Sequence, residues 1–157
     1  MNIFIGGPRS ITKLDELAVL RLRNIRNKNF NVLVGDCSGI DKSVQQFFLG
    51  YENVTVYASN GIARNNIGKW PVASIEVSKG VSGRAFYEAK DIAMTQDCDY
   101  GFMIWNGESK GTLGNIKRLS KLKKVALVFL APERKFVAVR DEASLADLLG
   151  RAAKPRR

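Results

Sequence analysis

The sequence predicts an α/β fold of the Rossmann-like type, with three layers and a mainly parallel sheet of about five to seven strands. Short apolar segments of strand length alternate along the chain with longer segments whose apolar residues recur at helical spacing. Several of the short segments end in a glycine-containing loop that leads directly into a helical segment, as in βαβ units. Right-handed crossovers then place all of these loops at one edge of the sheet.

The chain length of 157 residues fits one domain with a proper core. We assign residues 1–150 to a single Rossmann-like domain. Residues 151–157 are basic, and we expect them to form a disordered tail.

The first strand and helix are predicted in residues 2–28. Residues 2–5 are apolar and run into a glycine loop at 6–10. Residues 12–15 resemble a capping box, with Asp15 in place of the usual Glu or Gln, so we expect a helix from there to about Lys28. Its inner face would carry the apolar residues Leu14, Leu17, Ala18, Leu22 and Ile25.

Two more strands and one helix are expected before residue 59. The strands are 32–34 and 54–58, and between them the loop 35–41 leads into a helix. Segment 59–82 is rich in Asn, Gly and Ser, and an insertion of this length is typically functional or mobile. Residues 72–77 are a candidate strand within it. The residues that the helix would bury are Ile40, Val44, Phe47 and Phe48.

The second half continues the alternation. A helix at about 83–96 would turn Ala85, Ala89, Ile92 and Ala93 inward. The remaining expected elements are a strand at 100–105, a loop at 106–112, a helix to about Leu122, a strand at 124–130, an edge strand at 136–139 and a short helix at 144–149.

The chain is strongly basic. Its formal net charge is +10, of which residues 151–157 contribute +4, so the remaining 150 residues still carry +6. Such a field attracts nucleotides, nucleic acid or acidic membranes. For the tail, solubility alone is the alternative explanation. Lys121, Lys123 and Lys124 form a basic edge that we interpret as a solvated helix end.

Several classes of protein are disfavoured by what the sequence lacks. It has no apolar run of about 18 residues, so no transmembrane helix is expected. Its first residues do not have the pattern of a secretory signal. The two cysteines, Cys37 and Cys98, lie too far apart to suggest a disulfide framework or a CxxC metal site. We therefore expect a cytoplasmic protein that uses no metal and no cofactor.

The chain contains no histidine, which removes the commonest general base and the commonest zinc ligand. Catalysis would have to use carboxylates, Lys, Tyr, Cys or backbone groups. Asp36 and Glu108 are the candidate catalytic carboxylates for cleavage of an N-glycosidic bond. The alternatives are a loop residue that bonds its own backbone for Asp36 and a solvated surface charge for Glu108. Asp41 is interpreted as a helix cap or dipole partner.

Three strands end in glycine-containing loops, at 6–10, 35–41 and 106–112. In doubly wound sheets, ligands bind outside the carboxyl ends of the strands, where glycines and helix N-termini allow close contact with a phosphate. Arg9 and Lys110 would add full charges, and Thr112 would offer a hydroxyl to an oxyanion or cap its own helix. No loop matches GxGxxG or the Walker sequence. Each glycine alone would also suit a tight turn, but three such loops in a basic protein favour an anion site.

Arginine and aromatic residues extend the candidate site. Arg84 would lie in the first turn of its helix, where a guanidinium can grip a phosphate, and Arg64 lies in the insertion. Trp70 is the better candidate for stacking on a base, since Trp105 ends a strand and is more typical of a core. Tyr87 and Tyr100 are interpreted as structural, and Cys37 as a small loop residue.

The segments Gly6-Gly7-Pro8-Arg9-Ser10, Val34 to Lys42 and Trp105 to Thr112 resemble the three signature segments of the SLOG superfamily, over about residues 1–130. This group includes Smf-type DNA-processing proteins and the Lonely Guy phosphoribohydrolases. The resemblance implies a Rossmann-like fold, a site for nucleotides or nucleotide-derived signals, and a homodimer. With the residues added above, the candidate ligand-binding residues are Gly6, Gly7, Arg9, Ser10, Gly35, Asp36, Ser38, Gly39, Asp41, Arg64, Arg84, Gly107, Lys110, Gly111 and Thr112.

One position departs from the Lonely Guy pattern. These enzymes carry a PGGxGTxxE segment whose glutamate serves the active site, and Asn115 stands at that position here. An amide cannot act as a carboxylate acid or base. This puts a cytokinin-type phosphoribohydrolase activity in doubt.

Three functions remain open from the sequence. The leading one is a sensor or binding module for a nucleotide or nucleotide-derived small molecule. The second is an N-glycoside hydrolase that acts on a nucleotide or nucleoside. The third is single-stranded nucleic-acid binding through the basic surface, as in the Smf-type proteins. None of them involves a membrane.

Overall fold

The computed structural model describes residues 1–154. Its core is one seven-stranded sheet in the order β4-β3-β2-β1-β5-β6-β7, in which every neighbouring pair is parallel except β6 and β7. This confirms the predicted fold class. No helix in residues 1–154 is long and apolar enough to cross a membrane. The strands are β1 (Asn2–Gly6), β2 (Asn31–Gly35), β3 (Val54–Ser59), β4 (Val72–Ile75), β5 (Tyr100–Trp105), β6 (Ala126–Leu130) and β7 (Lys135–Val139).

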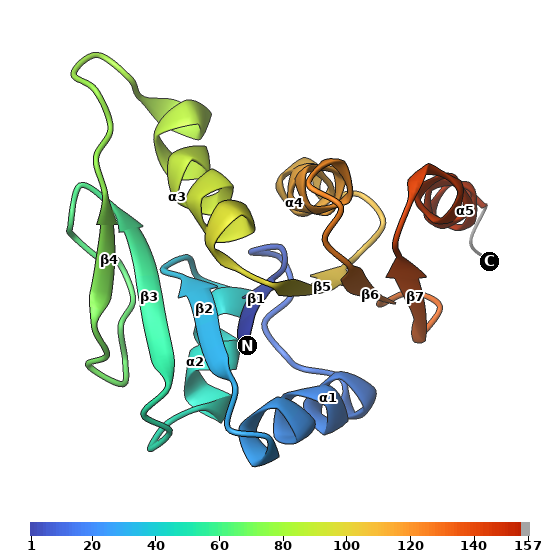
Figure 1. The fold of residues 1–157 in the computed structure, drawn as a ribbon, viewed down its shortest axis with the longest axis horizontal. Coiled ribbons are helices and arrows are strands. Elements are labelled where there is room, and N and C mark those ends of the chain that lie inside the picture. The colour runs from blue at the N-terminus through green and yellow to red at the C-terminus, as the bar shows by residue number, and fades with distance from the viewer. Residues whose placement is uncertain (155–157) are drawn as a thin grey trace.

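Helices cover both faces of the sheet (Figure 1). On one face, α1 (Glu16–Asn27) and α2 (Ile40–Phe47) enclose a core that includes Leu22 and Val44. On the other face, α3 (Gly83–Asp97), α4 (Lys110–Lys121) and α5 (Glu142–Ala152) enclose a second core. From β1 the chain adds β2, β3 and β4 on one side, and from β5 it adds β6 and β7 on the other side. The switch point of the sheet therefore lies between β1 and β5.

The first helix begins later than the sequence pattern suggests. Asp15 is its N-cap, and the Asp15 carboxylate accepts a hydrogen bond from the amide of Leu17 at 2.9 Å. The expected start at residues 12–15 is therefore wrong, because Asp15 supplies the cap that was assigned to Thr12. The inner face is otherwise as predicted, with Ala18, Leu22 and Ile25 buried.

The insertion at 59–82 contributes the edge strand β4 and a loop anchored on the core. The indole nitrogen of Trp70 donates to the carbonyl of Tyr51 at 2.7 Å, and the Asn66 side chain bonds both the amide and the carbonyl of Trp70. Trp70 is buried. The expectation that its ring stacks on a ligand base is wrong, because the ring packs into the core beneath α2.

The inner face of α3 also differs from its prediction. Ala85 and Ile92 are exposed, and the residues that α3 buries are Lys90, Met94 and Thr95. The apolar pattern predicted the wrong inner face because α3 directs Lys90 toward buried carboxylates, as described below.

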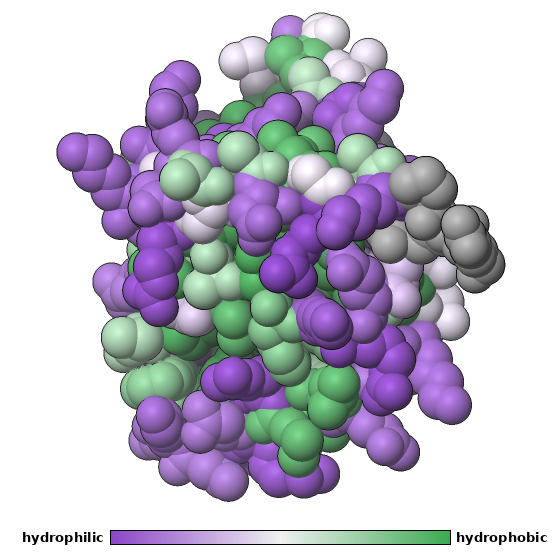
Figure 2. Space-filling model, turned by 90° about the vertical axis from the view of Figure 1, so that its right-hand side faces the viewer, coloured by the Kyte–Doolittle hydropathy of each residue, from purple (hydrophilic) through white to green (hydrophobic). Residues whose placement is uncertain are grey.

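The last helix runs further than expected. α5 reaches Ala152 and so includes two residues of the segment assigned to the tail, whereas 155–157 lie outside the described residues. The face at the β7 and α5 end of the sheet is mostly hydrophilic, with smaller hydrophobic areas between (Figure 2), as is typical of a surface in contact with water.

Candidate functional site

A pocket of about 350 Å³ opens at the switch point between β1 and β5. The loop after β1 forms one side, the start of α4 forms another, and α3 closes the third. This is the position at which doubly wound sheets bind their ligands. The lining residues are Phe4, Gly6, Gly7, Pro8, Arg9, Asp41, Arg84, Asp91, Ser109, Lys110, Gly111, Thr112 and Asn115.

The pocket brings together eight of the residues expected to bind ligand. They come from all three predicted loops and from α3: Gly6, Gly7, Arg9, Asp41, Arg84, Lys110, Gly111 and Thr112. The remaining candidates lie elsewhere. Ser10 and Ser38 are exposed beside the pocket, Gly35 and Asp36 are buried below it, and Arg64 lines a neighbouring hollow. Gly39 and Gly107 do not line it either.

The first two loops are packed directly against each other. The amide of Ile40 donates to the carbonyl of Pro8 at 3.2 Å. A Cβ on Gly7 would lie 2.7 Å from the Ile40 side chain, and a Cβ on Gly39, whose φ is +75°, would lie 2.5 Å from the Arg9 backbone. These two glycines are therefore required by the contact between the loops, whatever ligand the pocket holds.

The third loop is held in place by its own side chains. The Asn106 carboxamide oxygen accepts hydrogen bonds from the amides of Glu108 and Ser109, at 2.9 and 2.8 Å. Ser109 is the N-cap of α4, so the capping role considered for Thr112 belongs to Ser109. The indole of Trp105, buried as expected, donates to the Ser109 carbonyl at 3.0 Å. These bonds fix the conformation of the first turn of α4, which lines the pocket.

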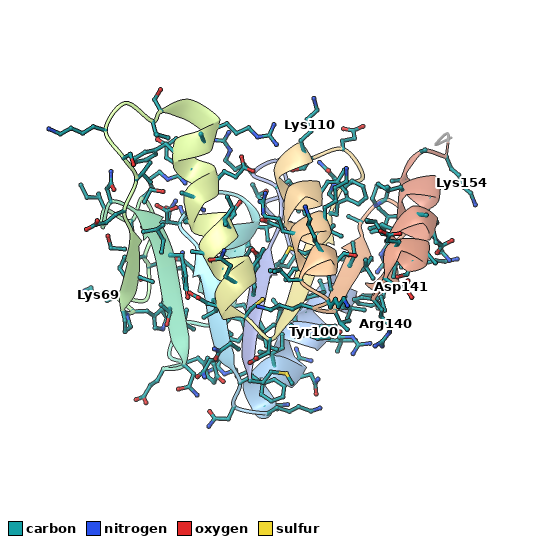
Figure 3. All side chains as sticks on the ribbon, turned by 45° about the horizontal axis from the view of Figure 1, so that its top comes forward. Lys69, Tyr100, Lys110, Arg140, Asp141 and Lys154 are labelled. Atoms are coloured by element: carbon teal, nitrogen blue, oxygen red, sulfur yellow. The ribbon has the colours of Figure 1, made fainter. Side chains whose placement is uncertain are left out.

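A second hollow of about 470 Å³ continues the pocket along α3. It shares Arg9, Arg84, Asp91 and Gly111 with the first pocket and adds Arg64, Gly83, Tyr87 and Glu88. We call the two hollows together the loop-edge groove. Its side chains include four cations, Arg9, Arg64, Arg84 and Lys110. Figure 3 shows Lys110 at the end of α4 that borders it.

Tyr87 gives the groove an exposed aromatic ring. The residue is 43% exposed, and the Arg64 guanidinium lies 4.2 Å from the ring centroid. The guanidinium is stacked over the ring as a cation–π pair, and planar groups of both kinds can stack on bases. Tyr87, interpreted as structural from the sequence, thus contributes its ring to the wall of the groove.

Beneath the groove lies a buried cluster of charges centred on Lys90. This residue is 2% exposed, and its Nζ lies 3.5 Å from Asp36 Oδ1, 3.6 Å from Asp91 Oδ1 and 3.9 Å from Asp41 Oδ2. Burial opposes the positive charge, but the three carboxylates outweigh it and raise the pKa of Lys90 above its ordinary value. Lys90 was not predicted as a site residue, since a single lysine in an amphipathic segment does not indicate which way its side chain points.

Both carboxylate oxygens of Asp36 accept hydrogen bonds from Arg64. The bonds come from the Arg64 amide at 2.9 Å, from Arg64 Nη2 at 2.9 Å and from Arg64 Nε at 3.3 Å. Burial would raise the pKa of Asp36, but these bonds and the nearby charges of Arg64 and Lys90 hold it below the ordinary value. Glu108 is exposed and borders neither hollow. A catalytic role for either residue stays a prediction, and the carboxylates that do line the pocket are Asp41 and Asp91.

Asp41 and Asp91 form an acidic floor under the basic rim. Burial raises the pKa of Asp41 to about 6, and it raises the pKa of Asp91 as well. Asp41 accepts a hydrogen bond from the Cys37 amide at 3.2 Å, and Asp91 accepts one from the Asn115 side chain at 3.4 Å. Asn115 also accepts from Arg118 at 2.8 Å, so it links the floor to α4.

The thiol of Cys37 is a poor nucleophile in this arrangement. Burial raises the pKa of the Cys37 thiol, which keeps it protonated and weakly nucleophilic. Among residues 1–154, no group of three or more His, Cys, Asp or Glu side chains is placed to hold a metal ion.

No family model matches the chain, and no curated protein matches it in sequence. Among solved structures, it is similar to DNA processing protein A from Helicobacter pylori, whose structure was described for its single-stranded DNA binding mode. The match covers 98% of this chain and 74% of that chain, with a TM-score of 0.64 and 13% sequence identity. At this identity the two proteins share a fold, and it is the fold expected from the resemblance to Smf-type proteins.

Proposed function

We propose that the protein binds single-stranded nucleic acid in the loop-edge groove. The observation that carries this proposal is the combination of four cationic side chains with one exposed tyrosine in a continuous groove at the switch point. Sequence-tolerant binding of single strands uses these two elements, a positively charged path for the backbone and an aromatic surface for the bases.

Each part of the groove has a distinct role in this proposal. A phosphate would sit at the N-terminus of α4, where free amides and the side chains of Lys110 and Arg9 favour negative charge. Arg84 would contact the next phosphate through its forked guanidinium. A base would stack on the cation–π pair of Tyr87 and Arg64.

Two further observations support the proposal. The net charge of +10 favours association with polyanions. A solved protein with the same fold is described as binding single-stranded DNA, and we carry that property to this chain as part of the proposal.

Fluorescence anisotropy with a labelled four-nucleotide oligothymidylate tests it. Stacking is worth about 1–3 kcal/mol per base, so Tyr87→Ala should weaken binding by roughly 5- to 150-fold, while Tyr87→Phe keeps most of the affinity. Arg84→Ala should lower the affinity and reduce the dependence on salt by about one phosphate contact.

The control is Arg23→Ala, which removes an exposed cation from α1 on the opposite face of the sheet. This variant should bind like the parent protein. If the tetranucleotide binds equally to the parent, Tyr87→Ala and Arg84→Ala proteins, the groove is not the binding site.

A second candidate function, binding of a mononucleotide or nucleotide derivative, is favoured by the volume of the pocket. A space of about 350 Å³ falls in the range of small-molecule sites. The carboxylates of Asp41 and Asp91 would accept hydrogen bonds from sugar hydroxyls. A thermal-shift panel of nucleotides tests this, because a ligand at 100 times its Kd stabilises the protein by about 2.7 kcal/mol. A panel without any shift would speak against this function.

A further inference from the structure

A row of lysines runs along the exposed side of α4, outside the loop-edge groove. Lys110, Lys117 and Lys121 are spaced by seven and four residues, which places them on one side of the helix. All three are exposed. None has a carboxylate within ion-pair distance among residues 1–154.

A third hollow, of about 630 Å³, lies at the far end of this row, between α4 and the start of α5. Figure 3 shows Arg140 and Asp141 beyond the end of α4 opposite to Lys110. Four cations line the hollow, Lys117, Lys121, Lys123 and Arg140, against the two carboxylates of Asp141 and Glu142. We call Lys110 and these four cations the α4 basic row.

Asp141 also has a structural role at the start of α5. Its Oδ1 accepts a hydrogen bond from the amide of Ser144 at 2.8 Å, and the Ser144 hydroxyl accepts one from the Asp141 amide at 3.1 Å, which together form the capping box of α5. Four cations against two carboxylates leave the hollow with an excess of positive charge.

Other basic residues of α4 and its C-terminal turn are used within the fold. Lys124 donates to the carbonyls of Thr95 and Gln96 at 2.8 and 2.7 Å, where it satisfies the end of α3. Arg118 pairs with Glu88 at 2.8 Å. The members of the α4 basic row make no such contacts through their side chains in residues 1–154, so the charge of this row is left for a partner.

We propose that the α4 basic row extends the nucleic-acid path beyond the groove. A single strand that leaves the pocket past Lys110 would follow α4 to the hollow beside Arg140. This inference rests on the proposed function, since the row begins where the groove ends. The 12 residues of α4 span about 18 Å, which is the length of this path.

The experiment compares two labelled oligothymidylates, of four and twelve nucleotides, by anisotropy over a range of salt concentrations. The variant Lys117→Gln, Lys121→Gln, Lys123→Gln removes three charges of the row. The matched control is Lys13→Gln, Arg23→Gln, Lys28→Gln, which removes the same net charge from exposed positions in α1 and next to its two ends. Thermal unfolding of both variants verifies that they fold.

We expect the parent protein to bind the 12-mer more tightly than the 4-mer. The row variant should lose about tenfold in 12-mer affinity, and its salt slope should fall by about 2, since a single-strand phosphate contact contributes about 0.7. Its 4-mer affinity should match that of the control variant, because the groove is intact.

Two results would overturn the inference. One is a 12-mer affinity that falls equally in the row and control variants, which would assign the effect to net charge. The other is equal affinity of the parent for both lengths, as expected if the row serves an acidic protein instead. A failure of the proposed groove site would be seen separately, as a 4-mer affinity that is the same in the parent and Tyr87→Ala proteins.

Discussion

The buried charge cluster beneath the groove depends on Lys90. This residue is a full positive charge under the sheet edge, and three aspartates from two different segments lie within 4 Å of its Nζ. Removing one member of a buried charge cluster leaves the others without compensation, and this is costly. The cluster therefore fixes α3 against the loop after β2 and sets the position of the groove wall.

Substitution of Lys90 tests this role through stability. Lys90→Met preserves most of the side-chain volume but leaves Asp36, Asp41 and Asp91 without their shared cation. We expect a loss of about 3–5 kcal/mol in the free energy of unfolding, measured with urea. The control Lys121→Met, at an exposed helical position, should change stability by no more than about 0.5 kcal/mol. A Lys90→Met protein as stable as the control would show that the cluster is not structural.

Asp41 makes the pocket sensitive to pH. Its pKa is raised to about 6 by burial, and the charges around it are Lys90 and Asp91 from α3 and Asp36 from the β2 loop. Below pH 6 the Asp41 carboxyl becomes neutral, so the pocket becomes more positive. The affinity for an oligothymidylate without terminal phosphate should therefore rise as the pH falls from 7.5 to 5, because its diester charges do not change in this range.

Asp41→Asn separates this effect from others. The variant keeps a hydrogen-bond acceptor for the Cys37 amide but no longer titrates. Its affinity at pH 7.5 should approach that of the parent at pH 5, with a flatter pH dependence. An unchanged pH dependence in Asp41→Asn would point instead to Asp91, whose pKa is also raised.

At the scale of the elements, the start of α4 decides how well the pocket is formed. Ser109 caps the helix, and its hydroxyl accepts a hydrogen bond from the Thr112 amide at 3.4 Å. Ser109→Ala should cost about 1 kcal/mol of stability. It should also weaken oligonucleotide binding, because the first turn of α4 would fray. Ser120→Ala, near the other end of the same helix, is the matched control and should leave binding unchanged; equal weakening in both variants would contradict the role of the cap.

The order and type of the elements were predictable because their signals are local. Strand length, helical spacing and glycine loops identified every strand of the sheet, including the candidate strand now seen as β4. The errors arose where tertiary contacts override local pattern. Thr12 resembled a cap, but Asp15 takes that role, and the alanines of α3 suggested an inner face that Lys90 and Met94 occupy.

The site was predictable in outline only. The loops that carry Gly7, Asp41 and Lys110 do meet, because parallel strands end at one edge. Which side chains face the groove could not be read from the sequence. Trp70, expected to stack on a base, is buried in the core, whereas Tyr87, interpreted as structural, lines the groove. The direction of an aromatic ring depends on packing between segments distant in the chain.

At the scale of the whole molecule, the two cores share one sheet and should unfold together. Each core contains one tryptophan, Trp70 on the α1 and α2 face and Trp105 on the α3 to α5 face. The single-tryptophan proteins Trp105→Phe and Trp70→Phe therefore report on the two faces separately. Within each variant, we expect the fluorescence and far-UV circular dichroism transitions in urea to coincide. A fluorescence transition of Trp70 that precedes the loss of helix would show that its face opens independently.

The reversed direction of β7 has a practical consequence for work with this protein. Because β7 is antiparallel to β6, α5 starts at the amino edge of the sheet and carries Lys154 back toward the edge that holds Lys110 (Figure 3). Met1 precedes β1 and lies at the other edge. A dye coupled near Lys154 would lie at the same edge of the sheet as the groove, whereas a surface tether is better attached near Met1, where it leaves the approach to the groove clear.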